Sequence, residues 1–195
     1  MHWRKITLTG VGLLGGSLGL ALKQRRLADE VVGYVRRPAS VDECAKRGAV
    51  DRATCDLRQA IAQAELVVMC TPIARMRELI EQMLPALRPG TVLTDVGSAK
   101  ASLVREVEPL ASRAGAHFVG SHPMAGNEKM GVQAASADLF EDAVCVVTPT
   151  PQAAAAAVAQ VEGLWTAVGA RVMRLTPEAH DELVSRSSHL PHIVA

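Results

Sequence analysis

Hydrophobic residues in this chain form short runs that alternate with longer stretches of amphipathic character. The runs are rich in Val, Leu and Ile, and Pro or Gly follows several of them. Such runs are typical of parallel strands buried on both faces, with crossover helices between them. The predicted strands are 6–9, 31–35, 66–70, 91–95, 117–120, 143–148 and 171–175, with a short strand or turn at 49–51. We therefore predict an α/β fold with a mostly parallel, doubly wound sheet.

A glycine-rich turn joins the first predicted strand to the first predicted helix. Its glycines have the G-x-G-x-x-G spacing: the first permits a tight turn, the second lets the backbone approach a pyrophosphate, and the third lets helix and strand pack closely. Phosphates would then lie at the helix N-terminus, where free N–H groups favour negative charge. The turn consists of Gly10, Val11, Gly12, Leu13, Leu14 and Gly15. An ordinary tight turn is the alternative, but this context favours a dinucleotide-binding domain of the Rossmann type.

The end of the second predicted strand bears on the choice of cofactor. Enzymes of this fold that use NAD place a carboxylate about 20 residues beyond the glycines, whereas an arginine there can hold a 2′-phosphate. This chain has Arg36 and Arg37 at that point, followed by Ser40, and no carboxylate. A solvated surface pair is the alternative, but guanidinium geometry suits a phosphate. We predict NADP as the preferred cofactor, with NAD as the alternative.

The remaining helices define the domain organisation. They are predicted at 17–22, 41–47, 57–64, 76–87, 103–114 and in the alanine-rich stretch that ends at Trp165. Thr176-Pro177 begins another helix, and the sequence stops within its apolar run at 193–195. We expect residues 1–175 to form the dinucleotide-binding domain. Residues 176–195 are expected to begin a second, helical domain that needs further chain.

Composition argues against several classes of partner. The 21 basic and 20 acidic residues nearly cancel, so bulk charge does not indicate a nucleic-acid or anionic-membrane partner. No apolar stretch approaches the roughly 20 residues of a membrane span, and the N-terminus does not resemble a signal peptide. The cysteines show no metal-site spacing and are predicted to be mainly buried free thiols, as in the cytoplasm. They are Cys44, Cys55, Cys70 and Cys145.

Three later motifs carry candidate chemistry. Residues 95–100 (Asp-Val-Gly-Ser-Ala-Lys) and 120–128 (Gly-Ser-His-Pro-Met-Ala-Gly-Asn-Glu) each follow a predicted strand. His122 is read as a loop histidine that can titrate near neutral pH, although most single loop histidines are surface or structural residues. The third motif contains His189 and His192, which would share one helix face. Nothing nearby completes a zinc site, so no metal is predicted.

Together these motifs resemble the prephenate/arogenate dehydrogenases of tyrosine biosynthesis. The resemblance covers essentially the whole chain, including the glycine turn, the 70–72 strand end and the 176–181 segment (Thr-Pro-Glu-Ala-His-Asp). It implies NAD(P)-dependent oxidative decarboxylation of a cyclohexadienol. Hydride leaves the carbon that bears the hydroxyl, carbon dioxide departs, and the ring becomes aromatic. Prephenate would give 4-hydroxyphenylpyruvate, and arogenate would give tyrosine; the sequence leaves open which is used and whether tyrosine exerts feedback.

The resemblance also implies roles for particular residues. His122 would accept a hydrogen bond or the proton from the ring hydroxyl, and Ser98 would orient the imidazole and the nicotinamide. The substrate side of the cleft would be lined by Glu128, His189 and His192. The cofactor would lie against the strand end formed by Cys70, Thr71 and Pro72. In the family a helical domain follows, forms a homodimer and supplies an arginine for the substrate carboxylate; no residue here matches that arginine.

Two other functions stay open at this point. Other two-domain dehydrogenases, such as the β-hydroxyacid group or the pyrroline-carboxylate reductases, share the first hundred residues in outline but lack the His122 motif. A nucleotide-binding module without turnover is the second. Titration with cofactor and substrate would separate them.

Overall fold

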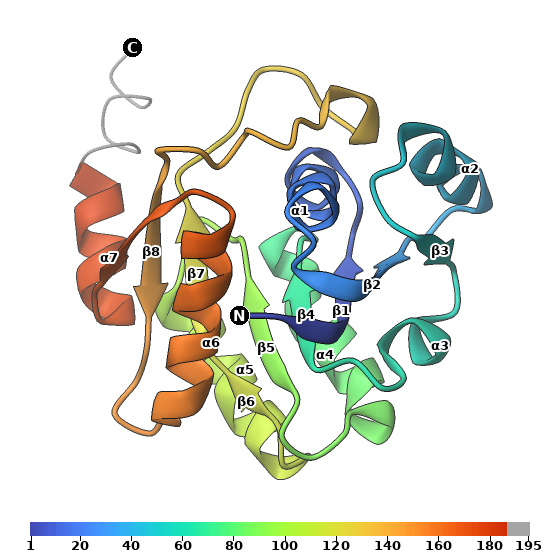
Figure 1. Ribbon diagram of the computed structural model, residues 1–195. Helices are drawn as coiled ribbons and strands as arrows, with labels where there is room; N and C mark the ends of the chain where they lie inside the picture. The colour runs from blue at the N-terminus through green and yellow to red at the C-terminus, as the bar shows by residue number, and fades with distance from the viewer. Residues whose placement is uncertain (187–195) are drawn as a thin grey trace.

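The structure, a computed structural model, describes residues 1–186, and the predicted site residues His189 and His192 lie outside that part. Its main element is a six-stranded, wholly parallel sheet in the order β3-β2-β1-β4-β5-β6 (Figure 1). The strands are β1 (Trp3–Thr9), β2 (Ala28–Tyr34), β3 (Arg52–Thr54), β4 (Leu66–Met69), β5 (Val92–Asp95) and β6 (His117–Phe118). The prediction of a doubly wound, mostly parallel sheet is confirmed.

A second sheet of three strands extends the first. It contains β7 (Gly120–Pro123), β8 (Val144–Thr148) and β9 (Arg171–Arg174). β7 is antiparallel to β8, whereas β8 and β9 are parallel. Val119 alone separates β6 from β7, and its N–H donates to the carbonyl of Leu93 (2.9 Å), so one extended segment passes from sheet to sheet.

This continuation corrects the predicted position of His122. We predicted a strand that ends at Gly120 and a loop after it. Instead His122 lies inside β7, paired in register with Val146 of β8. The extended backbone continues because β8 supplies ladder partners as far as Pro123. His122 is therefore held by a sheet and not by a loop.

The second correction concerns β3. We predicted a short strand or a turn at 49–51. These residues lie in a bend, so the strand alternative is wrong, and the paired residues are Arg52–Thr54. Ala49 and Val50 are instead buried, and the Asp51 carboxylate accepts a hydrogen bond from the backbone N–H of Val31 (2.8 Å). The segment therefore packs as a loop before it pairs as a strand.

Helices cover both faces of the main sheet, with α1 and α6 on one side and α4 and α5 on the other (Figure 1). They are α1 (Leu13–Gln24), α2 (Pro38–Arg47), α3 (Leu57–Ile61), α4 (Ile73–Met83), α5 (Ala101–Arg113), α6 (Ala155–Ala167) and α7 (Pro177–Val184), with short 3₁₀ turns η1 (Leu84–Ala86) and η2 (Val132–Ala134). Most correspond to predicted helices. Among residues 1–186, no helix combines the length and apolar character needed to cross a bilayer.

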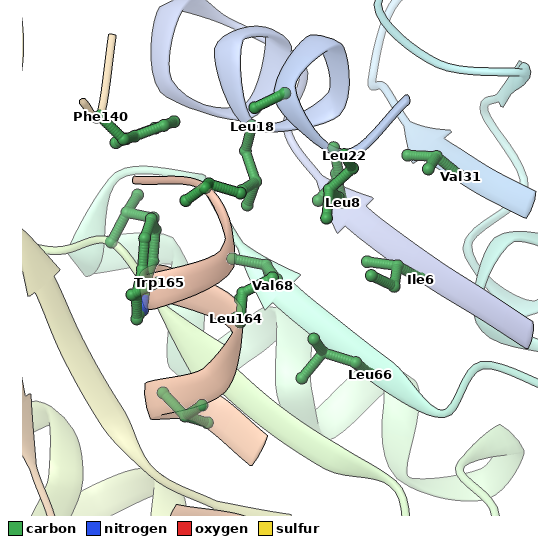
Figure 2. Packing of buried hydrophobic residues seen from close by; sticks show 14 of the residues in the cluster. Ile6, Leu8, Leu18, Leu22, Val31, Leu66, Val68, Phe140, Leu164 and Trp165 are labelled. Carbon is green, nitrogen blue, oxygen red and sulfur yellow. The ribbon is translucent and has the colours of Figure 1, made fainter. Parts of the chain in front are cut away.

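The core is divided into two layers by the sheet. Leu66 and Val68 of β4 face the cluster under α1 and α6, whereas Val67 and Met69 face the cluster under α4 and α5. This alternation explains why the strand reads as a continuous apolar run: both of its faces are buried. Figure 2 shows the first cluster, which gathers side chains from α1, β1, β4 and α6, Trp165 among them.

Glycines permit close approach where α1 passes over the sheet. Gly10 has φ +95°, in the left-handed region that favours glycine. A Cβ at Gly15 would lie 2.0 Å from the carbonyl oxygen of Gly10, and one at Gly19 would lie 2.1 Å from that of Ala49. The roles predicted for the first and third glycines of the turn fit these contacts. Gly19 adds a contact that holds α1 against the loop before β3.

We predict that Gly19→Ala destabilises the protein by about 1–3 kcal/mol, because the added methyl overlaps a backbone oxygen that cannot move independently. Gly163→Ala in α6 is the matched control. Its Cβ would meet only the flexible side chain of Met1, so the usual helix preference for alanine should make it neutral or slightly stabilising. Urea unfolding of both variants measures the difference. Equal stabilities of the two variants would contradict the packing role of Gly19.

Candidate active site

A cavity of about 250 Å³ lies at the carboxyl ends of β1, β2 and β4. This is the edge at which open α/β sheets bind ligands. Its lining residues are Gly10, Val11, Gly12, Tyr34, Val35, Arg36, Arg37, Ser40, Glu43, Cys70, Thr71, Pro72, Gly131 and Val132. The structure thus brings together eight of the predicted cofactor residues. Leu13, Leu14 and Gly15 begin α1 beside the cavity without lining it.

Two observations show that this cavity fits a dinucleotide. No atom lies within 4 Å of a Cβ placed on Gly12, and the N-terminus of α1 that Gly12 caps carries no side-chain cap. An anion can therefore approach the N–H groups of the first helical turn. In addition, the Thr71 hydroxyl is buried without a hydrogen-bond partner among the described residues. Burying a hydroxyl without a hydrogen-bond partner costs free energy, and a ligand group that bonds to this hydroxyl would remove that cost.

The two predicted arginines have different surroundings. Nη2 of Arg37 lies 3.8 Å from the Glu43 carboxylate and 3.3 Å from the Ser40 hydroxyl. Arg36 is exposed and lines both this cavity and a smaller adjoining one that it shares with Thr71. Within residues 1–186, Arg36 has no salt bridge. Arg36 is thus better placed than Arg37 to meet a phosphate of the cofactor.

A buried carboxylate joins the two sheets beside this edge. Asp95, the last residue of β5, accepts hydrogen bonds from the backbone N–H groups of Gly97 (2.7 Å) and Ser121 (3.1 Å). It also pairs with the Lys100 ammonium, which in turn donates to the Ser121 carbonyl (2.9 Å). Asp95 and Lys100 are both fully buried. Ser121 belongs to β7, so this ion pair fixes β7 relative to the main sheet.

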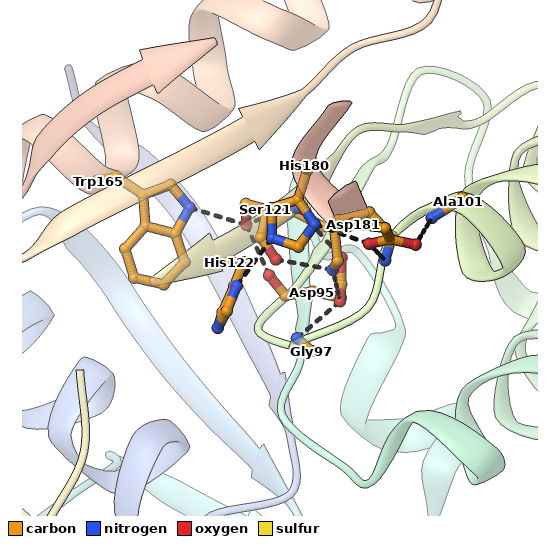
Figure 3. Close-up of polar contacts among 10 residues, drawn as sticks. Asp95, Gly97, Ala101, Ser121, His122, Trp165, His180 and Asp181 are labelled. Atoms are coloured by element: carbon orange, nitrogen blue, oxygen red, sulfur yellow. Dashed lines mark hydrogen bonds and ion pairs between the residues drawn. The ribbon is translucent and has the colours of Figure 1, made fainter. Parts of the chain in front are cut away.

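The Ser121 hydroxyl completes this junction. It donates to the Asp95 backbone carbonyl (2.6 Å) and receives the indole N–H of Trp165 (2.9 Å). Figure 3 shows these contacts, with His122 on the strand directly after Ser121. Because Asp95 pairs in register with Met69, directly before Cys70, the junction sets His122 near the same carboxyl edge as the cavity.

His122 is hydrogen-bonded to a second histidine that the sequence analysis did not single out. Its Nδ1 lies 2.9 Å from Nε2 of His180, a fully buried residue of α7. Nδ1 of His180 lies 2.8 Å from the Asp181 carboxylate (Figure 3). Asp181 in turn accepts from the backbone N–H groups of Lys100 (2.8 Å) and Ala101 (2.9 Å) at the start of α5.

The environment of Asp181 keeps it ionised. Partial burial alone would raise the pKa of this carboxyl, but the hydrogen bonds from Ala101, His180 and Lys100 outweigh it and the pKa lies below its ordinary value. The stabilisation that Asp181 contributes is therefore complete at neutral pH and is lost as the pH falls through the acidic range.

Two other predicted site residues, Ser98 and Glu128, lie outside the cofactor cavity. Ser98 is exposed in the turn between β5 and α5, and Glu128 is exposed in the segment after β7. Neither lines the cofactor cavity. Their predicted roles stay predictions, as do those of His189 and His192.

Several lining residues were missed by the sequence analysis. They are Tyr34, Val35, Glu43, Gly131 and Val132; Ser40 was noted beside the arginines but given no role. The segment that carries Gly131 has no recognisable motif, and it reaches the cavity because it folds back over α1, where the Ser136 N–H donates to the Ser17 hydroxyl (3.0 Å). For His180 and Asp181 a signal existed, since both belong to a motif noted in the sequence.

Thiol and metal chemistry have little support at this site. Burial raises the pKa of Cys44 to about 11 and raises the pKa values of Cys70 and Cys145 as well, so their reactive thiolate forms are disfavoured. Cys55 is an exposed free thiol. Among the described residues, no three His, Cys, Asp or Glu side chains are grouped as a metal would require.

A larger cavity, about 470 Å³, lies at the opposite edge of the sheet, between the start of β1 and the turn before β5. Its arginines are already engaged: Arg4 pairs with Glu65 (2.6 Å) and Arg88 donates to Gln63 (2.6 Å). Size alone does not make it a functional site.

The parallel sheet and the glycine turn define a Rossmann-type dinucleotide-binding domain. Comparison with known proteins agrees: the family profile "Prephenate dehydrogenase, nucleotide-binding domain" matches residues 18–174. The chain belongs to the prephenate dehydrogenase family.

Individual relatives give the same picture. The chain is 34% identical to prephenate dehydrogenase of Bacillus subtilis, covering 97% of this chain and 51% of that protein, and 31% identical to cyclohexadienyl dehydrogenase of Zymomonas mobilis, covering 99% and 65%. Among solved structures, prephenate dehydrogenase of Aquifex aeolicus in complex with hydroxyphenyl propionate and NAD⁺ superposes with TM-score 0.92 at 30% identity, over all of this chain and 67% of that one. The chain thus spans about half to two thirds of these relatives.

More distant structures share only the fold. A 3-hydroxyisobutyrate dehydrogenase from Mycobacterium tuberculosis has a TM-score of 0.76 at 18% identity, covering 97% of this chain and 60% of that one. This is the β-hydroxyacid group considered above as an alternative. At this identity the likeness is one of architecture alone.

We predict that Lys100→Met lowers the free energy of unfolding by about 3–5 kcal/mol, because it leaves the Asp95 carboxylate buried and unpaired. Lys23→Met is the control. Lys23 pairs with Asp51 at 2.9 Å, but their side chains are 33% and 41% exposed, so its loss should cost about 1 kcal/mol or less. Urea unfolding tests both variants. Equal losses would mean that the Lys100 charge does not hold the junction together.

Proposed function

We propose that the protein containing this chain catalyses the NAD(P)-dependent oxidative decarboxylation of a cyclohexadienol, prephenate or arogenate, in tyrosine biosynthesis. The observation that carries the proposal is the placement of His122. It lies on β7, tied by the Asp95 junction to the sheet edge that also forms the dinucleotide cavity. A base at that edge can reach a substrate that lies against the nicotinamide.

In this proposal His122 accepts the proton of the substrate and later returns it. Bound nicotinamide supplies a hydride acceptor. His122 takes the proton of the ring hydroxyl while hydride leaves the carbon that bears this hydroxyl. That carbon becomes a carbonyl carbon. The bond to the ring carboxylate then breaks, carbon dioxide leaves, and its electron pair makes the ring aromatic. The phenolate oxygen takes the proton back from His122, so the histidine is regenerated.

Other residues would orient the reactants. We propose that Ser98 aligns the His122 imidazole with the nicotinamide, and that Glu128, His189 and His192 line the substrate side. Thr71, whose hydroxyl has no hydrogen-bond partner among residues 1–186, would offer that hydroxyl to the cofactor. Gly10 and Gly12 leave room for the pyrophosphate.

NADP is the cofactor that we propose to be preferred. Arg36 at the cavity supports this, because its guanidinium has no salt bridge among the described residues and can engage a 2′-phosphate. Glu43 lines the same cavity and is held by Arg37. NAD is the alternative, and the two are distinguished by the Arg36 variant below.

We also propose how the chain is organised in the whole protein. α7 would begin a second, helical domain at residue 176, and that domain would form a homodimer. The relatives are longer than this chain, which supports a further domain. The cytoplasm is the compartment that we propose.

The proposed activity is tested by mixing the intact protein with NADP or NAD and either prephenate or arogenate. Reduced nicotinamide should appear together with 4-hydroxyphenylpyruvate from prephenate or tyrosine from arogenate. If the cofactor binds in a titration but neither substrate yields reduced nicotinamide, the protein is a binding module without this activity.

We predict that Arg36→Asp weakens NADP binding about tenfold to a hundredfold, because it removes a charge-assisted contact of about 1.5–3 kcal/mol. The new carboxylate should admit NAD through its ribose hydroxyls. Arg105→Asp on the exposed side of α5 makes the same charge change away from the cavity and should leave both affinities unchanged. Calorimetric titration gives the dissociation constants. An unchanged NADP affinity in Arg36→Asp would show that Arg36 is only surface charge.

We predict that His122→Asn preserves cofactor binding and lowers kcat by about 10²–10⁴-fold, since asparagine cannot accept the proton. In the wild type the limiting rate should rise with pH through a histidine, whose ordinary pKa is about 6.5, because only neutral imidazole is a base. This acidic limb should vanish in the variant. His117→Asn, an exposed histidine on β6, is the matched control and should keep both rate and pH profile. A His122→Asn enzyme with normal kcat and its acidic limb intact would place the base elsewhere.

A further inference from the structure

The two histidines and Asp181 form a chain whose hydrogen-bond directions can be derived. Nδ1 of His122 faces Nε2 of His180 at 2.9 Å, and Nδ1 of His180 faces Asp181 Oδ1 at 2.8 Å. The two rings meet edge to face, with centroids 5.1 Å apart and planes at 72°. His180 is fully buried, so its ring nitrogens depend on these partners for hydrogen bonding.

The direction of the chain is set at Asp181. Its two oxygens accept the backbone N–H groups of Lys100 (2.8 Å) and Ala101 (2.9 Å), and these bonds favour the ionised form. An ionised carboxylate only accepts hydrogen bonds, so the proton in its bond with His180 must belong to the histidine Nδ1.

The position of the proton on His180 determines the position of the proton on His122. A neutral imidazole with a proton on Nδ1 has a lone pair on Nε2, so Nε2 of His180 is an acceptor. Nδ1 of His122 must then be the donor. Neutral His122 accordingly has its proton on Nδ1 and its basic lone pair on Nε2, because the bond made by one ring nitrogen fixes the state of the other.

We propose that His180, with Asp181, is a positioning residue that holds His122 in the tautomer whose Nε2 accepts the substrate proton. This inference rests on the proposed function for the identity of the proton donor. The tautomer itself follows from the contacts in the structure. When His122 becomes protonated it still donates through Nδ1 to His180, and the Asp181 carboxylate lies at the end of the same chain. The chain stabilises imidazolium at His122 without moving a proton along it.

A purely structural role for His180 is the competing explanation. α7 is already anchored to α5 by the two backbone bonds to Asp181, which do not involve the imidazole of His180. A histidine with a purely structural role could be hydrogen-bonded to any backbone carbonyl. The His180 ring is instead hydrogen-bonded to another imidazole, that of His122. The two explanations differ in what they predict for the His122 tautomer.

The test is Asp181→Asn in the intact protein, compared with Glu182→Gln. Asparagine keeps the size of the side chain but has only one oxygen. With that oxygen towards the Ala101 N–H, its amide can donate to His180 and allow the opposite tautomer, while the bond from the Lys100 N–H is lost. Glu182 is the adjacent carboxylate of α7, paired with Arg186 and outside the chain, so its variant controls for loss of a nearby charge. The readouts are kcat, KM and the ¹⁵N NMR signals of selectively labelled histidine.

We expect kcat of Asp181→Asn to fall about 10- to 100-fold with KM for the cofactor unchanged, as for other partners that orient a functional histidine. The ¹⁵N signals of His122 should show protonated Nδ1 in the wild type and in Glu182→Gln, and a shift towards protonated Nε2 in Asp181→Asn. His180→Phe serves as a second variant: it removes the acceptor, and His122 should then populate both tautomers.

Two results would overturn the inference: protonated Nε2 on neutral His122 in the wild type, or an Asp181→Asn protein whose tautomer and kcat both match the wild type. Because NMR needs no turnover, it distinguishes this inference from the proposed function. A protein that shows the expected tautomer but converts neither substrate would retain the positioning role and refute the proposed activity.

Discussion

Asp95 ends β5 with a carboxylate that is fully buried and accepts hydrogen bonds from Gly97, Ser121 and Lys100. A buried carboxylate is strongly disfavoured unless it is paired and hydrogen-bonded, so these partners are held in fixed positions around it. Ser121 then fixes β7, and β7 carries His122. The place of the candidate base relative to the cofactor edge therefore depends on this one charge.

The same segment of chain serves both halves of the site. Lys100, which neutralises Asp95 through its side chain, also offers its backbone N–H to Asp181, and Asp181 orients His180. The start of α5 thus connects the junction of the two sheets to the histidine pair. The dinucleotide edge is formed separately, by glycines of the β1–α1 turn and by the ends of β2 and β4. The parallel sheet brings the histidine pair and the dinucleotide edge together because all of its strands end at one edge.

Much of the fold and part of the site could be predicted from the sequence. The glycine turn and the apolar strands are local signals, since each depends on residues close together in the chain. His122 was recognised as a candidate, but its place inside β7 was not, because the pairing that extends the strand comes from β8. The contact between His122 and His180 joins residues 58 positions apart and forms only when α7 packs on α5. No local spacing could reveal it.

The proposal that His122 accepts the proton of the ring hydroxyl at the cofactor edge is tested most directly by a crystal structure of the intact protein with NADP and a hydroxyphenyl carboxylate. We expect the dinucleotide at Gly10, Gly12 and Thr71, with Nε2 of His122 about 2.6–3.2 Å from the ring hydroxyl. A nicotinamide bound away from β7, or a hydroxyl held by another group while His122 faces elsewhere, would contradict it.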